Sequence, residues 1–221
     1  NFFDNIIAEF TNWIKLQHQL QKERDHSINK LDFPFSSYRK NQHEFAAAVY
    51  KTIALNKKLL VEAPTGTGKT ISTIFPAVKA LGTKKCQKIF YLTAKQSTRK
   101  VAEETLQLLV KHGLSITAIT LTSKEQITFP EELDLADDEN PYYLGYYDRL
   151  RPALIDILTN EKVITRKIAE NYAKKHMLDP FEFSLDISNS CDVVIFDYNY
   201  LFDPLVKLQR FFTERNYDYT F

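Results

Sequence analysis

The sequence predicts an α/β fold in which helices cover both faces of a doubly wound parallel sheet, with an added helical insertion. Strand-like apolar runs alternate with helix-length amphipathic segments through the first half of the chain. A glycine-rich loop joins one such run to the helix that follows it. Strands that alternate with helices favour parallel pairing, because each crossover helix brings the next strand back in the same direction.

The segments before the glycine-rich loop come in a clear order. Apolar residues recur at a helical period from Phe3 to Ile14, which predicts a helix over 2–22. A second helix is expected over 41–55. The short apolar run that follows predicts a strand over 58–62, directly before the loop.

Beyond the loop the alternation continues. The pattern predicts a helix over 69–80 and then a strand over 88–93. A helix over 96–111 and a strand over 115–121 follow. Together with the strand before the loop, they predict the core of the parallel sheet.

The alternation stops after residue 122. Residues 123–190 contain an acid-rich stretch over 131–139 and two helical patterns, which predict a helical insertion. The patterned apolar residues are Tyr147, Leu150, Leu154 and Leu158 in the first, and Ile164, Ile168 and Tyr172 in the second. Asp192–Phe196 then predicts a buried strand that returns to the core, followed by an aromatic turn over 197–204.

Composition narrows the class of protein but not its ligand. The 221 residues suffice for a domain with a core, and the 29 Lys and Arg nearly balance the 28 Asp and Glu. Any argument for a nucleic-acid partner must therefore come from local patches. Cys86 and Cys191 are too few for a disulfide framework or a metal cage. No apolar run reaches membrane-spanning length and no signal peptide is present, so we expect a cytoplasmic, monomeric protein without a membrane partner.

The most specific motif is the loop Ala-Pro-Thr-Gly-Thr-Gly-Lys-Thr over 63–70. Its glycines let backbone N–H groups surround a triphosphate, and the helix that follows presents its positive end to the anion. Lys69 can reach the β and γ phosphates and Thr70 can ligate Mg²⁺. We therefore predict ATP and Mg²⁺ as cofactors, with Lys69 and Thr70 as catalytic residues. The predicted cofactor-binding residues of the loop are Pro64, Thr65, Gly66, Thr67, Gly68, Lys69 and Thr70.

A second candidate segment lies about 25 residues upstream of the loop, at Tyr38-Arg-Lys-Asn-Gln42. The amide of Gln42 can make two hydrogen bonds to an adenine edge, and Arg39 can stack on a base or pair with a phosphate. Both are predicted nucleotide-binding residues. The alternative is a surface turn ahead of a helix, with Gln42 exposed.

These motifs occur in series with Tyr91–Thr98, Leu121–Ile127 and Cys191–Pro204. The series, with Ala63 at the first glycine position of the loop, resembles the XPD/DinG family of superfamily-2 ATP-dependent DNA helicases. The resemblance extends from residue 33 to the end. It implies a RecA-like motor domain, single-stranded DNA as partner, 5′ to 3′ unwinding in the full protein and a role in DNA repair.

The resemblance also implies a domain organisation. Residues 1–32 correspond to a helix and linker from an upstream domain, which is nuclease-like in one bacterial branch. Residues 33–122 correspond to the first part of motor domain 1, and 123–190 to the helical insertion. Residues 191–221 correspond to the return to the core, ahead of the Walker B acid. Such a fragment is expected to hydrolyse ATP poorly on its own, because the second motor domain supplies an arginine to the γ-phosphate.

The resemblance assigns the DNA-contacting residues as well. Thr93, Lys95, Ser97 and Thr98 match the motif that lines the DNA track, and Lys124 matches a basic position in the insertion. Hydroxyl and ammonium groups suit phosphate contacts that do not depend on base sequence. The alternative is that Thr93 and Ser97 cap the helix that starts near residue 96.

In the family the insertion holds a four-cysteine iron–sulfur cluster. The corresponding positions here are Thr128, Leu135, Asn140 and Asp179, and none of them offers a thiolate. We therefore predict the insertion without a cluster and without iron–sulfur ligands.

Asp197 has two interpretations that stay open at this point. Val193–Asp197 is typical of a Walker B strand, whose acid holds Mg²⁺. The resemblance instead implies that this strand leads into the aromatic turn, and that Tyr217–Phe221 precedes the true acid. Two other functions remain as alternatives: a self-contained P-loop phosphotransferase that uses Asp197 as its Mg²⁺-binding acid, and a nucleotide-binding interaction module.

Overall fold

The computed structural model describes residues 2–64, 66–132, 135–136, 138–202 and 218–221. The helices are α1 (Phe2–Lys30), α2 (Gln42–Ala54), α3 (Lys69–Gly82), α4 (Gln96–Lys111), α5 (Lys124–Ile127), α6 (Tyr146–Asn160), α7 (Arg166–His176), α8 (Pro180–Ser190) and α9 (Asn199–Phe202), with a 3₁₀ turn η1 (Pro130–Glu132). The strands are β1 (Lys88–Thr93), β2 (Ala118–Thr120), β3 (Val163–Ile164), β4 (Val193–Asp197) and β5 (Tyr219–Thr220). Among these residues no helix is both long and apolar enough to cross a membrane.

The strands form one parallel sheet in the order β3-β2-β4-β1-β5. The central pair is β1 and β4, in register from Ile89 opposite Val193 to Thr93 opposite Asp197. The carboxyl ends of all strands therefore meet at one edge of the sheet, and their amino ends at the other. The sequence prediction of an α/β fold with a parallel sheet is confirmed.

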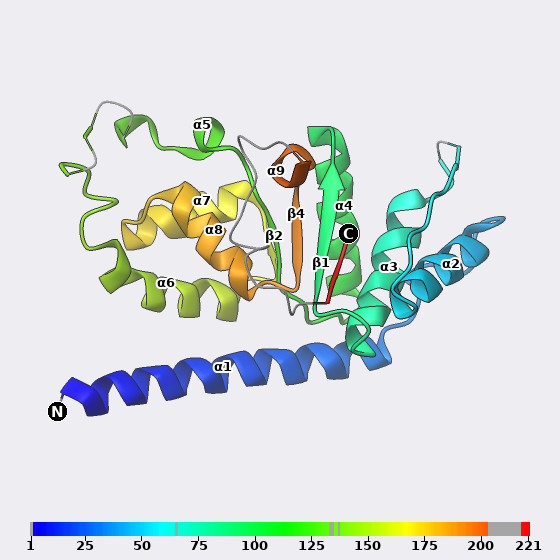
Figure 1. The fold of residues 1–221 in the computed structure, drawn as a ribbon, viewed down its shortest axis with the longest axis horizontal. Helices are drawn as coiled ribbons and strands as arrows, with labels where there is room; N and C mark the ends of the chain where they lie inside the picture. Colours follow the sequence, from blue (N-terminus) through cyan, green and yellow to red (C-terminus); the bar gives the residue numbers. More distant parts are fainter. Residues whose placement is uncertain (1, 65, 133–134, 137, 203–217) are drawn as a thin grey trace.

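Helices cover both faces of the sheet (Figure 1). Alternate residues of β4 enter different cores: Val193 and Ile195 pack with α3 and α4, whereas Val194 and Phe196 pack with α6, α7 and α8. A strand covered on both faces is apolar at every position, as the Val-Val-Ile-Phe run of β4 is.

Helix α1 runs along the amino edge of the sheet, beneath both layers (Figure 1). Its carboxyl half is held firmly, because Ile28 is buried in the α3/α4 core and fits against Gly82 of α3. Lys79 adds a hydrogen bond to the carbonyl of Ile28, at 2.8 Å. The helix is longer than the predicted 2–22, and its added turns dock on the domain through Arg24 and Ile28.

The predicted strand over 58–62 is wrong. Residues 57–64 have no regular secondary structure, and Leu60 is 99% exposed. A strand needs hydrogen-bonded neighbours, and within the described residues no strand pairs with this run. A cleft of about 1260 Å³ separates the run from the sheet, with Leu59 and Val61 on one wall and Ile89 and Phe221 on the other.

The insertion contains more structure than predicted. Helices α6 and α7 match the two apolar patterns, but Ile164 belongs to the short strand β3, which pairs with β2. Helix α8 was not predicted. Its signal is present in the sequence, since Asp179 caps its first turn by accepting the N–H of Glu182 at 2.6 Å and Pro180 stands at its first position.

Candidate functional site

The glycine-rich loop leads into the amino end of α3. Gly68 precedes the helix with a left-handed backbone (φ 76°, ψ 35°), and Gly66 also has a positive φ of 79°. These are conformations that side-chain-bearing residues rarely adopt. They turn the chain sharply into a 14-residue helix whose first N–H groups have no intrahelical partner. The arrangement suits a bound anion. Thr65 lies outside the described residues.

Lys69 folds back across the loop. Its Nζ donates to the carbonyls of Ala63 at 3.0 Å and Pro64 at 2.8 Å. Thr67 donates to the same Pro64 carbonyl at 2.9 Å. Because both acceptors are uncharged carbonyls, a phosphate oxygen can compete for the ammonium group of Lys69. Thr70 stands in the first turn of α3, where the sequence prediction needs an Mg²⁺ ligand.

The upstream segment contacts the loop directly. Gln42, only 5% exposed, accepts the backbone N–H of Arg39 through Oε1 at 2.9 Å. Its Nε2 fills the space that a Cβ on Gly68 would occupy. The guanidinium of Arg39 donates to the carbonyl of Gly66. The structure thus brings the two predicted nucleotide-binding segments together, and Gln42 is buried rather than exposed as the alternative of a surface turn required.

An aromatic cluster that the sequence prediction missed holds this segment on α3. Phe33 stacks on Tyr38 with ring centroids 3.8 Å apart and meets Phe75 of α3 edge-on at 5.5 Å. Tyr38 in turn meets His43 of α2 edge-on at 5.0 Å. The Phe-Pro-Phe sequence ahead of Arg39 is therefore an anchor rather than a linker.

The predicted DNA-contacting residues begin at the carboxyl end of β1. Thr93 is 4% exposed, and its Oγ1 has no hydrogen-bond partner within the described residues. Lys95 is the extended residue that precedes α4, and its side chain makes no capping bond. Ser97 and Thr98 are exposed in the first turn of α4, which carries no acidic residue. No side-chain hydrogen bond caps the start of α4, so the structure gives no support to a capping role of Ser97.

Lys124 is exposed in α5, which follows β2 at the same edge of the sheet. Its Nζ lies 5.9 Å from the ring centroid of Tyr143. The structure therefore places Lys124 at the carboxyl edge, but with neighbours from the insertion rather than from α4.

Asp197 ends β4 and pairs with Arg99 of α4, with 3.5 Å between Oδ2 and Nη2. Its Oδ1 accepts the N–H of Asn199 at 3.0 Å. Among the described residues, no hydrogen bond or ion pair joins this carboxylate to Lys69 or Thr70. These contacts make Asp197 a link between β4, α4 and the aromatic turn, and they give no support to a role in binding Mg²⁺.

Two of the four positions that correspond to iron–sulfur ligands, Asn140 and Asp179, belong to a buried polar network with Glu132. Asn140 donates to Glu132 at 3.1 Å, while Oδ2 of the fully buried Asp179 has no partner among the described residues. Burial raises the pKa of Glu132, and the charge of Asp179 adds to this effect. The two thiols lie elsewhere, and burial raises their pKa values to about 11 for Cys86 and about 12 for Cys191. Within the described residues no three His, Cys, Asp or Glu side chains are grouped for a metal ion.

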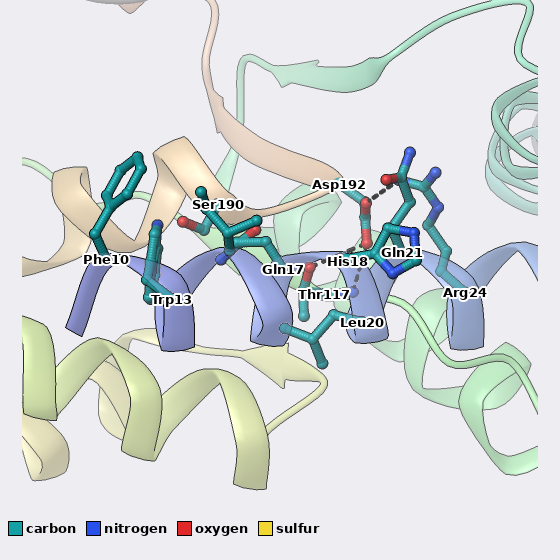
Figure 2. A pocket seen from close by; sticks show the side chains of 11 residues that line it. Phe10, Trp13, Gln17, His18, Leu20, Gln21, Arg24, Thr117, Ser190 and Asp192 are labelled. Atoms are coloured by element: carbon teal, nitrogen blue, oxygen red, sulfur yellow. Dashed lines mark hydrogen bonds and ion pairs between the residues drawn. The ribbon is translucent and has the colours of Figure 1, made fainter. Parts of the chain in front are cut away.

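A second cavity, of about 520 Å³, lies at the amino edge of the sheet against α1 (Figure 2). Arg24 pairs there with Asp192 at 2.6 Å, and Asp192 accepts both the N–H and the hydroxyl of Thr117 at 3.0 Å. None of the predicted site residues lines it. We assign this cavity to the docking of α1, because its polar contacts join the helix to the sheet.

Comparison with known proteins agrees with this geometry. The sequence profile described as DEAD/DEAH box helicase matches residues 40–162, more than half of the chain. Among solved structures, one titled "XPD_Helicase" matches 84% of this chain with a TM-score of 0.52 at 18% identity, a level that shows a shared fold. The match covers 32% of that chain, so the present chain spans about a third of its length. A search of curated proteins finds no match.

Proposed function

The chain belongs to the DEAD/DEAH box helicase family, and we propose that it is the N-terminal part of motor domain 1 of an XPD/DinG-like ATP-dependent DNA helicase. The observation that carries this proposal is the contact between the glycine-rich loop and the Arg39–Gln42 segment. One part suits a phosphate chain and the other a base, so together they suit a nucleotide.

The loop fits ATP on its own geometry. The backbone N–H groups at 66–70 and the ammonium of Lys69 would hold the phosphates, with Pro64 and Thr65 completing the loop. Thr70 would hold Mg²⁺. Gly68 fits this role because a side chain there has no room beside Gln42. When bound, ATP supplies the phosphoanhydride bond whose hydrolysis releases the free energy for movement. The chain itself binds and orients the nucleotide.

Arg39 and Gln42 would contact the base of the nucleotide. Oε1 of Gln42 already accepts a backbone bond from Arg39, which fixes the orientation of the amide. The donor Nε2, which lies against Gly68, is therefore the atom of Gln42 that would donate to an acceptor on adenine. Arg39 joins this segment to the loop through its bond to Gly66. A shift of Arg39 when phosphate binds would therefore also move the residues that contact the base.

Single-stranded DNA is the partner that we propose for the carboxyl edge of the sheet. Lys95, Ser97 and Thr98 present one ammonium and two hydroxyls at the uncapped start of α4, and Thr93 adds a hydroxyl below them. Lys124 extends the same edge. These groups suit phosphate contacts. We also propose 5′ to 3′ movement in the full protein, a nuclease-like upstream domain and a role in DNA repair. These three proposals rest on the resemblance to the XPD/DinG family alone.

Lys69→Ala tests the nucleotide site. Loss of the ammonium is expected to weaken Mg·ATP binding at least tenfold by calorimetry, because a charge-assisted bond to phosphate contributes about 1.5–3 kcal/mol. Lys111→Ala, a change at the exposed end of α4, is the matched control and leaves affinity unchanged. Equal ATP affinity in wild type and Lys69→Ala would contradict the proposal and favour the alternative of a nucleotide-binding interaction module.

A further inference from the structure

The turn after β4 exposes an aromatic ring at the edge that carries the proposed DNA contacts. Tyr198 is 45% exposed, although Phe196 two residues earlier is fully buried. The next residues, Tyr200 and Leu201, pack on the core beneath. Figure 1 shows α9 at the carboxyl end of β4, beside α4. Two rings are exposed among the described residues of this turn, Tyr198 and Phe202, and Tyr198 is the one that directly follows β4.

One contact joins the turn to the start of α4, and two more fix its backbone. The N–H of Tyr198 donates to the carbonyl of Thr93 at 3.1 Å, which ties the turn to the end of β1. Asp197 pairs with Arg99 of α4 and also accepts the N–H of Asn199, which begins α9. The backbone that carries the Tyr198 ring is therefore fixed before any ligand binds.

The neighbouring start of α4 has the properties of a phosphate site. The helix is 16 residues long and its first turn has no acid, and the side chain of Lys95, which precedes the helix, makes no capping bond to the first N–H groups. Beneath it, the buried hydroxyl of Thr93 has no partner among the described residues. Arg99 pairs with Asp197 and so compensates the charge of this carboxylate.

We propose that Tyr198 is a base-stacking residue, whose ring binds an unpaired base of a single strand whose phosphates contact the start of α4. The proposal rests on the proposed function and refines it, because it requires a base that is free of its duplex partner. Stacking on an aromatic face works for any base, so no sequence preference is expected from this contact.

Single-strand affinity of the whole chain tests the proposal, measured by fluorescence anisotropy with labelled oligothymidylate. Tyr198→Ala is expected to weaken binding about fivefold to tenfold, while Tyr198→Phe keeps the affinity because the ring is retained. Tyr147→Ala is the matched control, since Tyr147 is 83% exposed on α6. An oligomer of abasic sites should bind wild type and Tyr198→Ala equally.

Salt dependence separates the ring from the phosphate contacts. Tyr198→Ala should leave the slope of log affinity against log salt unchanged, whereas Lys95→Ala should reduce it by about 0.7, the value for one phosphate contact on a single strand. If wild type binds oligothymidylate and Tyr198→Ala binds it equally well, stacking is refuted and the proposed function stands. If wild type fails to bind any single strand, both proposals fall.

Discussion

At the scale of single residues, Gly68 joins the two halves of the candidate nucleotide site. A Cβ at this position would lie 2.3 Å from Nε2 of Gln42, and the backbone φ of 76° disfavours any side chain. Gly68→Ala is therefore expected to lower both ATP affinity and the melting temperature. The strained backbone costs about 1–2 kcal/mol and the clash with Gln42 adds to it. Calorimetry and thermal denaturation measure the two effects.

Two further variants separate the clash from the strain. Gly113 has a φ of 96° and nothing within 4 Å of its Cβ position, so Gly113→Ala measures the strain alone. Gln42→Ala in the Gly68→Ala background removes the clash and should restore part of the lost stability. A double variant that is no more stable than Gly68→Ala would show that Gln42 does not press on the loop.

Glu132 is the basis of a second prediction, which concerns the pH dependence of stability. It is buried between the N–H of Phe129 and the amide of Asn140, at 3.2 and 3.1 Å. Burial raises its pKa, and the charge of Asp179 raises it further. A pKa raised on folding stabilises the fold fully below the unfolded value, about 4.3, and this contribution is lost as pH rises through the folded pKa. Glu132→Gln should therefore flatten the pH dependence of the melting temperature, because it removes the group that titrates.

Glu131 supplies the control of opposite sign. Its pKa is lowered, first by its own backbone N–H and then by Lys174 and Tyr142, so its contribution is present at neutral pH and is lost as pH falls through the folded pKa. Glu131→Gln should remove a little stability at neutral pH. An unchanged pH profile in Glu132→Gln would show that Glu132 titrates normally in the fold.

At the scale of elements, the prediction of greatest effect concerns α1. Arg24 has 11% and Asp192 15% side-chain exposure, and their pair at 2.6 Å joins the helix to the amino edge of the sheet. Arg24→Ala leaves Asp192 without its cation and is expected to cost about 1–3 kcal/mol of unfolding free energy. The single tryptophan, Trp13, lies on α1 and reports its docking through fluorescence during urea denaturation.

The exposed pair between Arg151 and Glu9 is the control for that measurement. Its side chains are 43% and 66% exposed and 3.5 Å apart, so Arg151→Ala should change stability by less than about 0.5 kcal/mol. A Trp13 transition that is unchanged in Arg24→Ala would show that α1 is held by Ile28 and its apolar neighbours alone.

Elements were predictable where local pattern and tertiary packing agree. Helix α4 was expected over 96–111 and lies there, because its apolar residues face one core. The run 58–62 has strand-like residues but finds no partner in the described sheet, and pairing is a tertiary property. Ile164 fitted a helical spacing and a strand equally well, a known ambiguity of short apolar runs.

The candidate site divides in the same way. The glycines, lysine and threonine of the loop predict a phosphate site from sequence alone, because the groups that bind phosphate are neighbours in the chain. The fit of Gln42 against Gly68 and the pair Arg24–Asp192 join residues far apart in sequence, and no periodicity encodes them. The buried Glu132–Asp179 neighbourhood was missed for the same reason, although Asn140 and Asp179 had been singled out as ligand positions.

At the scale of the whole molecule, the proposed ligand contacts lie at the carboxyl edge of the sheet and the docking contacts of α1 lie at the amino edge. The carboxyl edge gathers the ends of β1 and β4 and the exposed start of α4, which are the proposed nucleic-acid contacts. The amino edge carries α1 and the Arg24–Asp192 pair. Parallel strands favour this division, since ligands bind beyond their carboxyl ends.

This division predicts that nucleotide binding and α1 docking contribute independently to stability. A ligand present at one hundred times its dissociation constant should add about 2.7 kcal/mol to the unfolding free energy. Arg24→Ala should keep this Mg·ATP increment although its baseline is lower, because Arg24 and the loop share no partner. Lys69→Ala should keep the baseline and reduce the increment to about 1.4 kcal/mol or less, the value for an at least tenfold lower affinity at the same ligand concentration. Urea denaturation of both variants with and without Mg·ATP measures all four values, and loss of the increment in Arg24→Ala would show instead that the docked helix helps to shape the nucleotide site.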